Sequence, residues 1–241
     1  FFSIFMGCCS SSKTAGPDGP QASGTKPEKK DAANISVQAS TQGKAVETAA
    51  ASQGGPSVLD KEIFAVQNKV RTDPKGFAAA HLTPRLANFD GKQMRQPDGV
   101  MLITNEGAEA VQEAIDVLNA QNPLQALTWD DELWKAARDH CLDSGAKGLF
   151  GHTGSDGSEF ADRMARYGDF VAKSGENCSY GSETAEEIVI QLLIDDGVES
   201  RGHRKNILDP AFKVVGCASG PHAQMRMCAV LDYAGGFEKA K

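Results

Sequence analysis

The sequence predicts an α+β fold in which helices flank a small, mostly antiparallel sheet. Helical spacing of apolar residues runs through much of 58–193, and two strand candidates, 212–218 and 225–233, follow one another near the end of the chain. A third strand candidate ends before Gly181. Helices followed by adjacent strands, without regular alternation of the two, are typical of a layered α+β domain.

Capping residues and apolar spacing locate the helices. The spacing predicts a helix over about 58–72, and the Asp-Pro pair that ends it begins a shorter helix over about 73–82. Residues 83–100 are expected to be irregular, and a helix over about 105–120 follows. Three further helices begin at capping residues, namely Asp130, Ser158 and Thr184.

Residues 1–57 differ in composition from the rest of the chain. They are rich in Ser, Gly, Ala, Thr, Gln and Pro, and after Phe5 they hold almost no large apolar side chains. Such a segment buries too little apolar surface to offset the entropy lost on ordering, so we expect a disordered arm. The folded domain is then 58–241, which is long enough for a sizeable core.

An acylation signal is present within the arm. Residues 6–11 read Met-Gly-Cys-Cys-Ser-Ser, which matches N-myristoylation if Met6 is the initiator. Gly7 would carry the acyl chain, and palmitoylation of Cys8 and Cys9 would add the further chains that stable anchoring needs. The protein would then be membrane-associated. In one alternative, Phe1–Met6 is the tail of a secretory signal, or belongs to a poor lipoprotein box that ends at Cys8, and the protein is secreted. In another, residues 1–5 are untranslated sequence or come from a truncated precursor.

Charge and motif content exclude several function classes. The net charge is −7, and no part of the domain combines a basic patch with interleaved aromatic residues, so nucleic acid is not an expected partner. No apolar run is long enough to span a bilayer. The glycine-rich motifs that bind nucleotide phosphates are absent, which leaves nucleotide binding without support.

The domain contains four cysteines, Cys141, Cys178, Cys217 and Cys228. No Cys-x-x-Cys spacing occurs, which argues against a structural zinc knuckle. Cys217 and Cys228 lie in two apolar segments joined by a turn-like stretch at 219–222, so they could face each other across a hairpin. Their oxidation state depends on the compartment.

Three polar side chains stand out as candidates for a functional site. His152, Glu176 and His203 each follow a glycine in a segment too polar to be core, where side chains are presented to a cleft. Two imidazoles and one carboxylate suit a divalent cation with a position left for water or a ligand. The remaining histidines have structural interpretations. His81 ends a helix, His140 lies inside a helix and His222 lies in a turn.

Four motifs occur in order along the domain. They are an Asn-x-x-Arg element ending at Arg71, Gly-Glu-Asn around Glu176, Gly-His at His203, and the closing Asp-Tyr-Ala-Gly-Gly-Phe at 232–237. Together they resemble the CAP superfamily of cysteine-rich secretory, antigen 5 and pathogenesis-related 1 proteins, whose module is also called the SCP domain. The His-Arg-Lys-Asn-Ile run and the closing stretch are similar to microbial and protist members. Gln67 stands where the family usually has a histidine.

This resemblance implies a three-layer α-β-α sandwich whose central cleft holds two histidines and two acidic residues. By motif these would include His152, Glu176 and His203, with a divalent cation such as zinc. The second acid does not transfer by motif, and Glu199 is our choice for it. Asp195 and Asp196 are the alternatives. Cys178 stands where the family generally has an aliphatic residue.

The resemblance also sets the functional hypotheses. Family members are secreted proteins of defence, venom, fertilisation and host interaction, several bind sterols or fatty acids, and no enzymatic activity is agreed for all. This implies a cation-containing module that binds sterol or fatty acid, more than a catalyst. The alternative is a metal-dependent, peptidase-like hydrolase in which the cation activates water. Variants of these hypotheses are Cys178 as a nucleophile beside His203, and a scaffold with an acidic surface for a protein partner.

Overall fold

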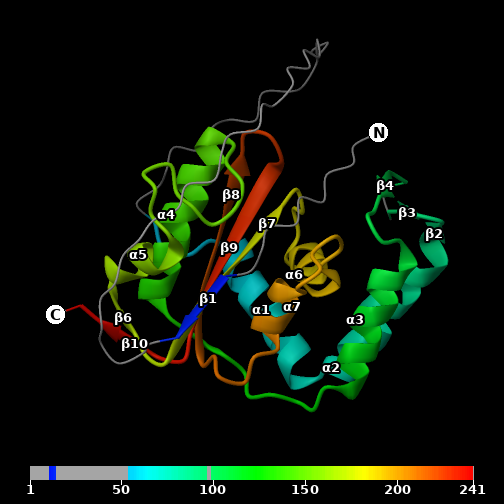
Figure 1. The fold of residues 1–241 in the computed structure, drawn as a ribbon, viewed down its shortest axis with the longest axis horizontal. Helices are drawn as coiled ribbons and strands as arrows, with labels where there is room; N and C mark the ends of the chain where they lie inside the picture. The colour runs from blue at the N-terminus through cyan, green and yellow to red at the C-terminus, as the bar shows by residue number, and fades with distance from the viewer. Residues whose placement is uncertain (1–10, 15–53, 97–98, 241) are drawn as a thin grey trace, which may run out of the picture. The chain divides into compact units, whose positions relative to one another are not determined.

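A five-stranded sheet with the strand order β1-β7-β9-β8-β5 lies at the centre of the computed structural model (Figure 1). The structure describes residues 11–14, 54–96 and 99–240. The long antiparallel strands are β7 (Lys173–Tyr180), β8 (Val214–His222) and β9 (Arg226–Ala234). At the two edges, β1 (Ser11–Thr14) pairs antiparallel with β7, and β5 (Thr128–Trp129) pairs parallel with β8.

Helices cover both faces of this sheet (Figure 1). One face carries α4 (Asp131–Lys147) and α5 (Phe160–Ala165), and the other carries α1 (Val58–Thr72), α6 (Ala185–Ile194) and α7 (Gly202–Ile207). The predicted α+β fold with a mostly antiparallel sheet is therefore confirmed. The strand before Gly181 and the two later strand candidates are β7, β8 and β9.

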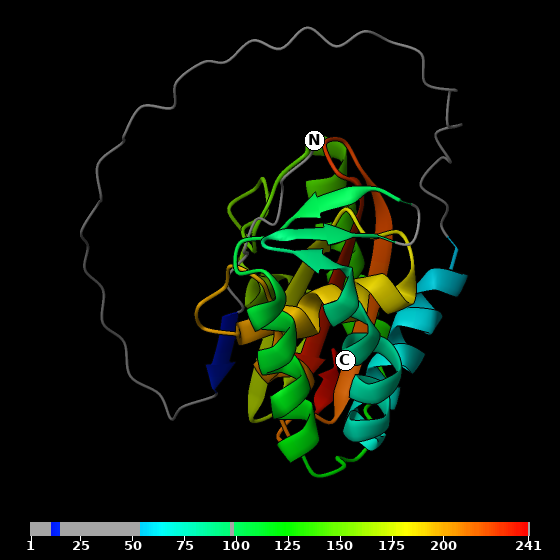
Figure 2. The same ribbon diagram turned by 90° about the vertical axis from the view of Figure 1, so that its right-hand side faces the viewer.

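The segment expected to be irregular, 83–100, has regular structure. A 3₁₀ helix at Thr83–Asn88 precedes the short strands β2 (Phe89–Asp90), β3 (Gln93–Arg95) and β4 (Met101–Ile103), which form a separate sheet (Figure 2). The turn between β2 and β3 contains Gly91 at φ 58, and Asp-Gly is a strong hairpin signal. Such short strands leave too weak an apolar pattern to be read from sequence.

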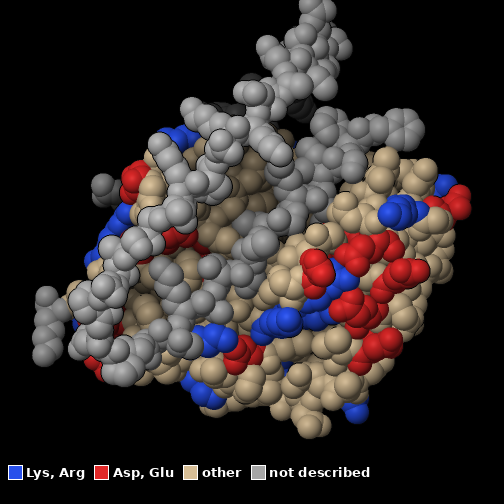
Figure 3. All heavy atoms as spheres, in the orientation of Figure 1, with Lys and Arg blue, Asp and Glu red and all other residues tan. Residues whose placement is uncertain are grey.

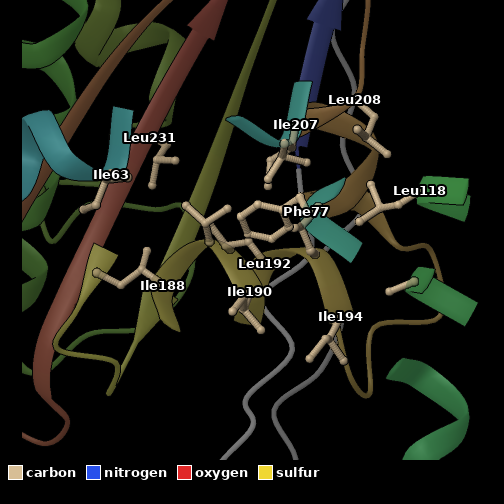
Figure 4. Packing of buried hydrophobic residues seen from close by; sticks show 14 of the residues in the cluster. Ile63, Phe77, Leu118, Ile188, Ile190, Leu192, Ile194, Ile207, Leu208 and Leu231 are labelled. Carbon is tan, nitrogen blue, oxygen red and sulfur yellow. The ribbon is translucent and has the colours of Figure 1, made fainter. Parts of the chain in front are cut away.

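The remaining elements connect these layers. They are α2 (Pro74–Phe77), a π-helix at Ala78–Leu82, α3 (Ala108–Ala120), and the paired strands β6 (Gly168–Phe170) and β10 (Phe237–Lys239). Apolar side chains from α1, α3, α6 and the sheet form the largest buried cluster. Within it, Phe77 lies among Leu192, Ile190 and Ile207 (Figure 4).

Two of the three predicted caps are confirmed, and the first helix begins at a cap that was not predicted. The Ser57 side chain accepts a hydrogen bond from the Asp60 amide, and Asp60 completes a capping box, so α1 begins at Val58. Asp130 and Thr184 cap α4 and α6 as expected, whereas the prediction for Ser158 is wrong by one residue, because Glu159 is the N-cap of α5. Each side chain satisfies an amide that the first helical turn leaves without a partner.

The expectation that Cys217 and Cys228 face each other across the hairpin is wrong. In the β8–β9 register Cys217 pairs with Leu231, and Cys228 pairs with Gly220. Strand β8 continues through the stretch expected to turn, which shifts the register along the chain. Cys228 instead lies beside Cys141 of α4, with the two Sγ atoms 3.5 Å apart, and all four domain cysteines are thiols.

Part of the N-terminal arm belongs to the sheet. Within the segment expected to be disordered, strand β1 pairs with β7, and Ser11 lies opposite Glu176. Gly7, Cys8 and Cys9 lie outside the described residues. No described helix has both the length and the apolar character needed to cross a membrane.

Candidate functional site

Glu176, on β7, is the centre of a buried polar cluster. Its Oε1 lies 2.7 Å from Nδ1 of His152, and its side chain is completely buried. Along a strand, alternate side chains share a face, so Glu176 and Cys178 both point toward the α4 layer. The structure thus brings together two of the predicted site residues, His152 and Glu176.

Arg163 of α5 holds the other carboxylate oxygen. Its Nη2 donates to Glu176 Oε2 at 2.8 Å and to the carbonyl of His152 at 2.9 Å. The guanidinium therefore fixes both the carboxylate and the loop that carries the histidine. Burial alone would raise the pKa of Glu176, but the hydrogen bond with His152 and the positive charges nearby bring that pKa to about 2.

A thiol and a second imidazole complete the cluster. Cys178 Sγ lies 3.7 Å from both His152 Nδ1 and Glu176 Oε1. One ligand atom each of His140, Glu176 and Cys178 lie within 4.8 Å of one another, and all three residues are buried. Imidazole, carboxylate and thiol together are the donor types that zinc prefers.

Asp232 adds a second buried acid. It lies directly opposite Glu176 in the β7–β9 register and is completely buried. No described residue gives either of its carboxylate oxygens a hydrogen bond. Burial and the adjacent negative charge of Glu176 raise the pKa of Asp232 well above its usual range.

His203 is held in a different set of contacts. Its Nδ1 lies 2.6 Å from Asp195 Oδ1, and its amide donates to Asp195 Oδ2 at 2.9 Å. Asp195 ends α6 in the left-handed conformation at φ 56, which turns the chain so that its carboxylate meets the first turn of α7. The sequence suggested a polar loop around His203, but this residue lies on the short helix α7.

The other two acidic candidates have separate positions. Asp196 is buried and accepts hydrogen bonds from the amides of Asn105 and Glu106 just before α3. Glu199, our choice for the fourth ligand, is exposed. Of the three candidates, Asp195 is therefore the one that contacts His203.

The motif residues around the site tie β7 to α7. The Asn177 side chain donates to the carbonyl of His203 at 3.0 Å, and Asn206 donates to Asn177 Oδ1 at 2.9 Å. Arg201 then links the start of α7 to Glu106 and Glu113 near α3, through Nη2 contacts of 2.5 and 2.7 Å. This network sets the position of His203.

Three residues of the cluster were not predicted from sequence: His140, Arg163 and Asp232. An acid within the apolar run of β9 was the available signal for Asp232, because a charged residue is rarely buried without a reason. The two helical residues lie on the same faces as apolar neighbours. His140 was therefore given a structural interpretation, and no sequence feature singled out Arg163. Cys178, considered as a nucleophile beside His203, contacts His152 instead.

Comparison with known proteins identifies the family. Residues 64–233 match the CAP, or cysteine-rich secretory protein, family. The chain belongs to the CAP family. The match covers most of the described domain and includes every residue of the Glu176 cluster, so this cluster is part of the CAP domain itself.

A curated relative matches a shorter stretch. The uncharacterized protein YkwD of Bacillus subtilis (strain 168) is 35% identical over 108 residues, which is 43% of this chain and 40% of that protein. The match thus spans less than half the length of this relative.

Three solved structures are similar to this chain at low sequence identity. An outer surface protein of Borrelia burgdorferi is 18% identical, with 55% of this chain and 89% of that chain covered and a TM-score of 0.38. An extracellular SCP-domain protein of Bacillus anthracis is 23% identical, with 58% and 43% covered and a TM-score of 0.38. NaASP2, solved with Zn²⁺, is 15% identical, with 79% and 90% covered and a TM-score of 0.38.

Proposed function

We propose that this CAP domain is a binding module with two ligands. It holds a divalent cation, for which Zn²⁺ is the first candidate, and it binds a sterol or fatty acid. The observation that carries the cation part is the buried cluster of imidazole, carboxylate and thiol donors around Glu176. The orphaned carboxylate of Asp232 and the Nδ1 of His140, which has no hydrogen-bond partner among the described residues, support the fit of a cation to these residues. The lipid part rests on the resemblance of the sequence motifs.

The burial of the cluster favours binding over hydrolysis. Glu176 is 0%, His140 1% and Cys178 3% exposed. A hydrolytic cation needs an open coordination position that water can reach, whereas a structural cation is closed in by protein ligands. A cation here would join α4 to the sheet and thereby support the binding surface, instead of activating water.

The distribution of charge favours a small apolar ligand over a nucleic acid. On the face shown in Figure 3, Lys and Arg lie interleaved with Asp and Glu. Arg201, for example, is paired with both Glu106 and Glu113. Such pairs leave little uncompensated positive charge for a phosphate backbone.

The attachment of the protein to a membrane is also part of the proposal. Myristoylation of Gly7 and palmitoylation of Cys8 and Cys9 would place the domain at a lipid surface, and secretion is the alternative. A role in defence or in host interaction would fit either location. Mass spectrometry of the N-terminal peptide from native material distinguishes the two: acyl chains support anchoring, and an unacylated Gly7 or a mature start beyond Cys9 excludes it.

Binding of labelled sterol and labelled fatty acid to the full chain tests the lipid part. The measurement is made on metal-free protein, with added Zn²⁺, and after chelation. Saturable binding that depends on Zn²⁺ is the expected result. Absence of binding under all three conditions would overturn the lipid part, and lipid hydrolysis with turnover would favour the enzymatic alternative.

A further inference from the structure

We propose that His140, Glu176 and the thiolate of Cys178 bind the cation, with His152 beside them. The site is selective for Zn²⁺ and Co²⁺ over Ca²⁺ and Mg²⁺. This inference rests on the proposed function only in that the domain holds a cation. It differs from the ligand set expected from the sequence, in which the motifs supplied His203 and Glu199 was chosen as the fourth ligand. It makes Cys178 the determinant of metal identity.

The first support is the mutual distance of the donor atoms. One atom each from His140, Glu176 and Cys178 lie within 4.8 Å of one another, and His152 Nδ1 lies 2.7 Å from Glu176 and 3.7 Å from Cys178. Zinc-to-ligand bonds of about 2.0–2.3 Å would separate neighbouring ligand atoms by roughly 3–4 Å. Small side-chain adjustments would therefore bring these donors to one cation.

The second support is the state of the His140 ring. Its Nε2 lies 2.8 Å from the carbonyl of Gly151, so Nε2 carries the proton and Nδ1 has a lone pair. That Nδ1 is buried and has no hydrogen-bond partner among the described residues, although leaving a buried acceptor unsatisfied is unfavourable. A hydrogen bond from the other ring nitrogen to a backbone carbonyl is the usual support of a metal-binding histidine.

The third support is the surroundings of Glu176. Arg163 holds its Oε2, as residues behind metal-binding carboxylates commonly do, and leaves Oε1 turned toward His152 and Cys178. The positive charge of Arg163 is offset by the carboxylate of Glu176, and a second buried acid, Asp232, lies directly across the strand pair. The cluster is therefore a built, closed site, made by β7, β9, α4, α5 and the loop at His152.

The donor set determines the class of metal. Thiolate and imidazole ligands suit Zn²⁺ and Co²⁺, whereas Ca²⁺ and Mg²⁺ require several oxygen ligands. On binding, the Cys178 thiol releases its proton to solvent and its sulfur forms the bond to the metal. We therefore expect Zn²⁺ to bind with proton release, and millimolar Ca²⁺ or Mg²⁺ not to compete.

Titration with Co²⁺ tests the site directly. The protein is the full chain in which Cys8 and Cys9 are replaced by serine, so that the adjacent thiols of the arm do not bind the probe. Saturable binding with a sulfur-to-cobalt charge-transfer absorption is expected, and Zn²⁺ should displace it. Cys178→Ser should abolish that absorption, and His140→Asn should weaken Co²⁺ binding at least tenfold.

Matched controls separate this site from the alternatives. Cys217→Ser removes a buried thiol from the opposite face of the sheet, and His222→Asn removes a buried histidine outside the cluster; both should bind Co²⁺ as the parent does. His203→Asn should also leave the absorption unchanged. An absorption that survives Cys178→Ser, or Co²⁺ binding that requires His203 but not Cys178, would overturn the proposal.

A measurement that leaves the cluster unsubstituted tests the proposal even if the variants fail to fold. Zn²⁺ should slow the alkylation of Cys178 by iodoacetamide and leave that of Cys217 unchanged, as measured by peptide mass spectrometry. The same rate at Cys178 with and without Zn²⁺ would overturn the proposal. The lipid assay on the same protein keeps the two proposals apart. Thiolate-bound Co²⁺ without lipid binding would refute only the lipid module, and lipid binding without a thiolate absorption would refute only the cation site.

Discussion

His152 and Glu176 are 24 residues apart in the sequence, and their side chains meet 2.7 Å apart at a carboxylate that has no contact with solvent. The contact holds the loop before α5 against strand β7. Because Arg163 holds the same carboxylate from α5, a single acidic side chain joins three segments of the chain. The candidate site therefore also stabilises the packing of these segments against one another.

Glu176→Gln should lower the free energy of unfolding by roughly 3–5 kcal/mol, the usual effect of breaking one side of a buried ion pair. The amide cannot balance the charge of Arg163, whose side chain is 2% exposed. Urea denaturation of the metal-free protein measures the change. Glu199→Gln, at an exposed position, is the control and should change stability by less than about 0.5 kcal/mol. An equally small effect at Glu176 would contradict the structural role.

The ion pair between Glu106 and Arg201 should make stability depend on pH in the acid range. Hydrogen bonds from Arg201 lower the pKa of Glu106 to about 2. Because the folded-state pKa lies below the unfolded value of about 4.5, the stabilisation is present above that value and is lost as the pH falls toward 2. The stability difference between the parent and Glu106→Gln should therefore shrink between pH 5 and about 2.

An exposed acid nearby provides the control for this pH series. Glu109→Gln, on α3, should show a stability difference from the parent that stays small throughout the series. Thermal unfolding at each pH is a sufficient measurement. A difference for Glu106→Gln that remained constant down to pH 2 would show that its contribution does not come from ionisation.

Arg71→Lys should destabilise the domain by about 3 kcal/mol, the loss of one or two hydrogen bonds to a charged group. The guanidinium is 1% exposed and donates to four backbone carbonyls, those of Gln125, Ile207, Asp209 and Phe212. A lysine ammonium has no planar fork with which to reach acceptors on both sides. Lys69→Arg, the reverse exchange at an exposed position of the same helix, should be neutral in the same denaturation assay. Equal stability of both variants would contradict this account.

Sequence reasoning located the long elements because local signals determine them. The caps of α1, α4 and α6 and the apolar spacing that follows each cap act within one or two turns of the chain. The strands β1, β5, β6 and β10 were not predicted. Each has two to four residues, and each exists only because a partner strand distant in sequence supplies its hydrogen bonds.

The same distinction applies to the site. His152 and Glu176 were predicted from their glycines and polar neighbours, although Glu176 is completely buried on β7 and is not presented by a loop. His140 and Arg163 lie on helix faces that pack inward, where a polar residue has no local signature, and only the packing of α4 and α5 on β7 brings them to the carboxylate. The contact between His203 and Asp195 depends on a left-handed turn, which sequence does not specify at an aspartate.

The thiols of Cys141 and Cys228 should form a disulfide under mild oxidation, for example with oxidised glutathione. Their Sγ atoms are 3.5 Å apart, and the hydrogen bond with Cys141 lowers the pKa of Cys228, which favours its thiolate as the attacking group. Cys228 would displace one glutathione, and Cys141 would then displace the second. The product has lost two hydrogen atoms, and peptide mass spectrometry identifies it.

This cross-link would join residues 87 apart in the sequence and should raise the free energy of unfolding by about 4 kcal/mol through the lost entropy of the unfolded chain. Both cysteines are buried, so the reaction should be slow and should accelerate in low concentrations of urea. Cys141→Ser should abolish the product, and Cys217→Ser should leave it intact. A disulfide between Cys217 and Cys228 would instead require a different β8–β9 register, because Cys217 pairs with Leu231 on the opposite face of the sheet.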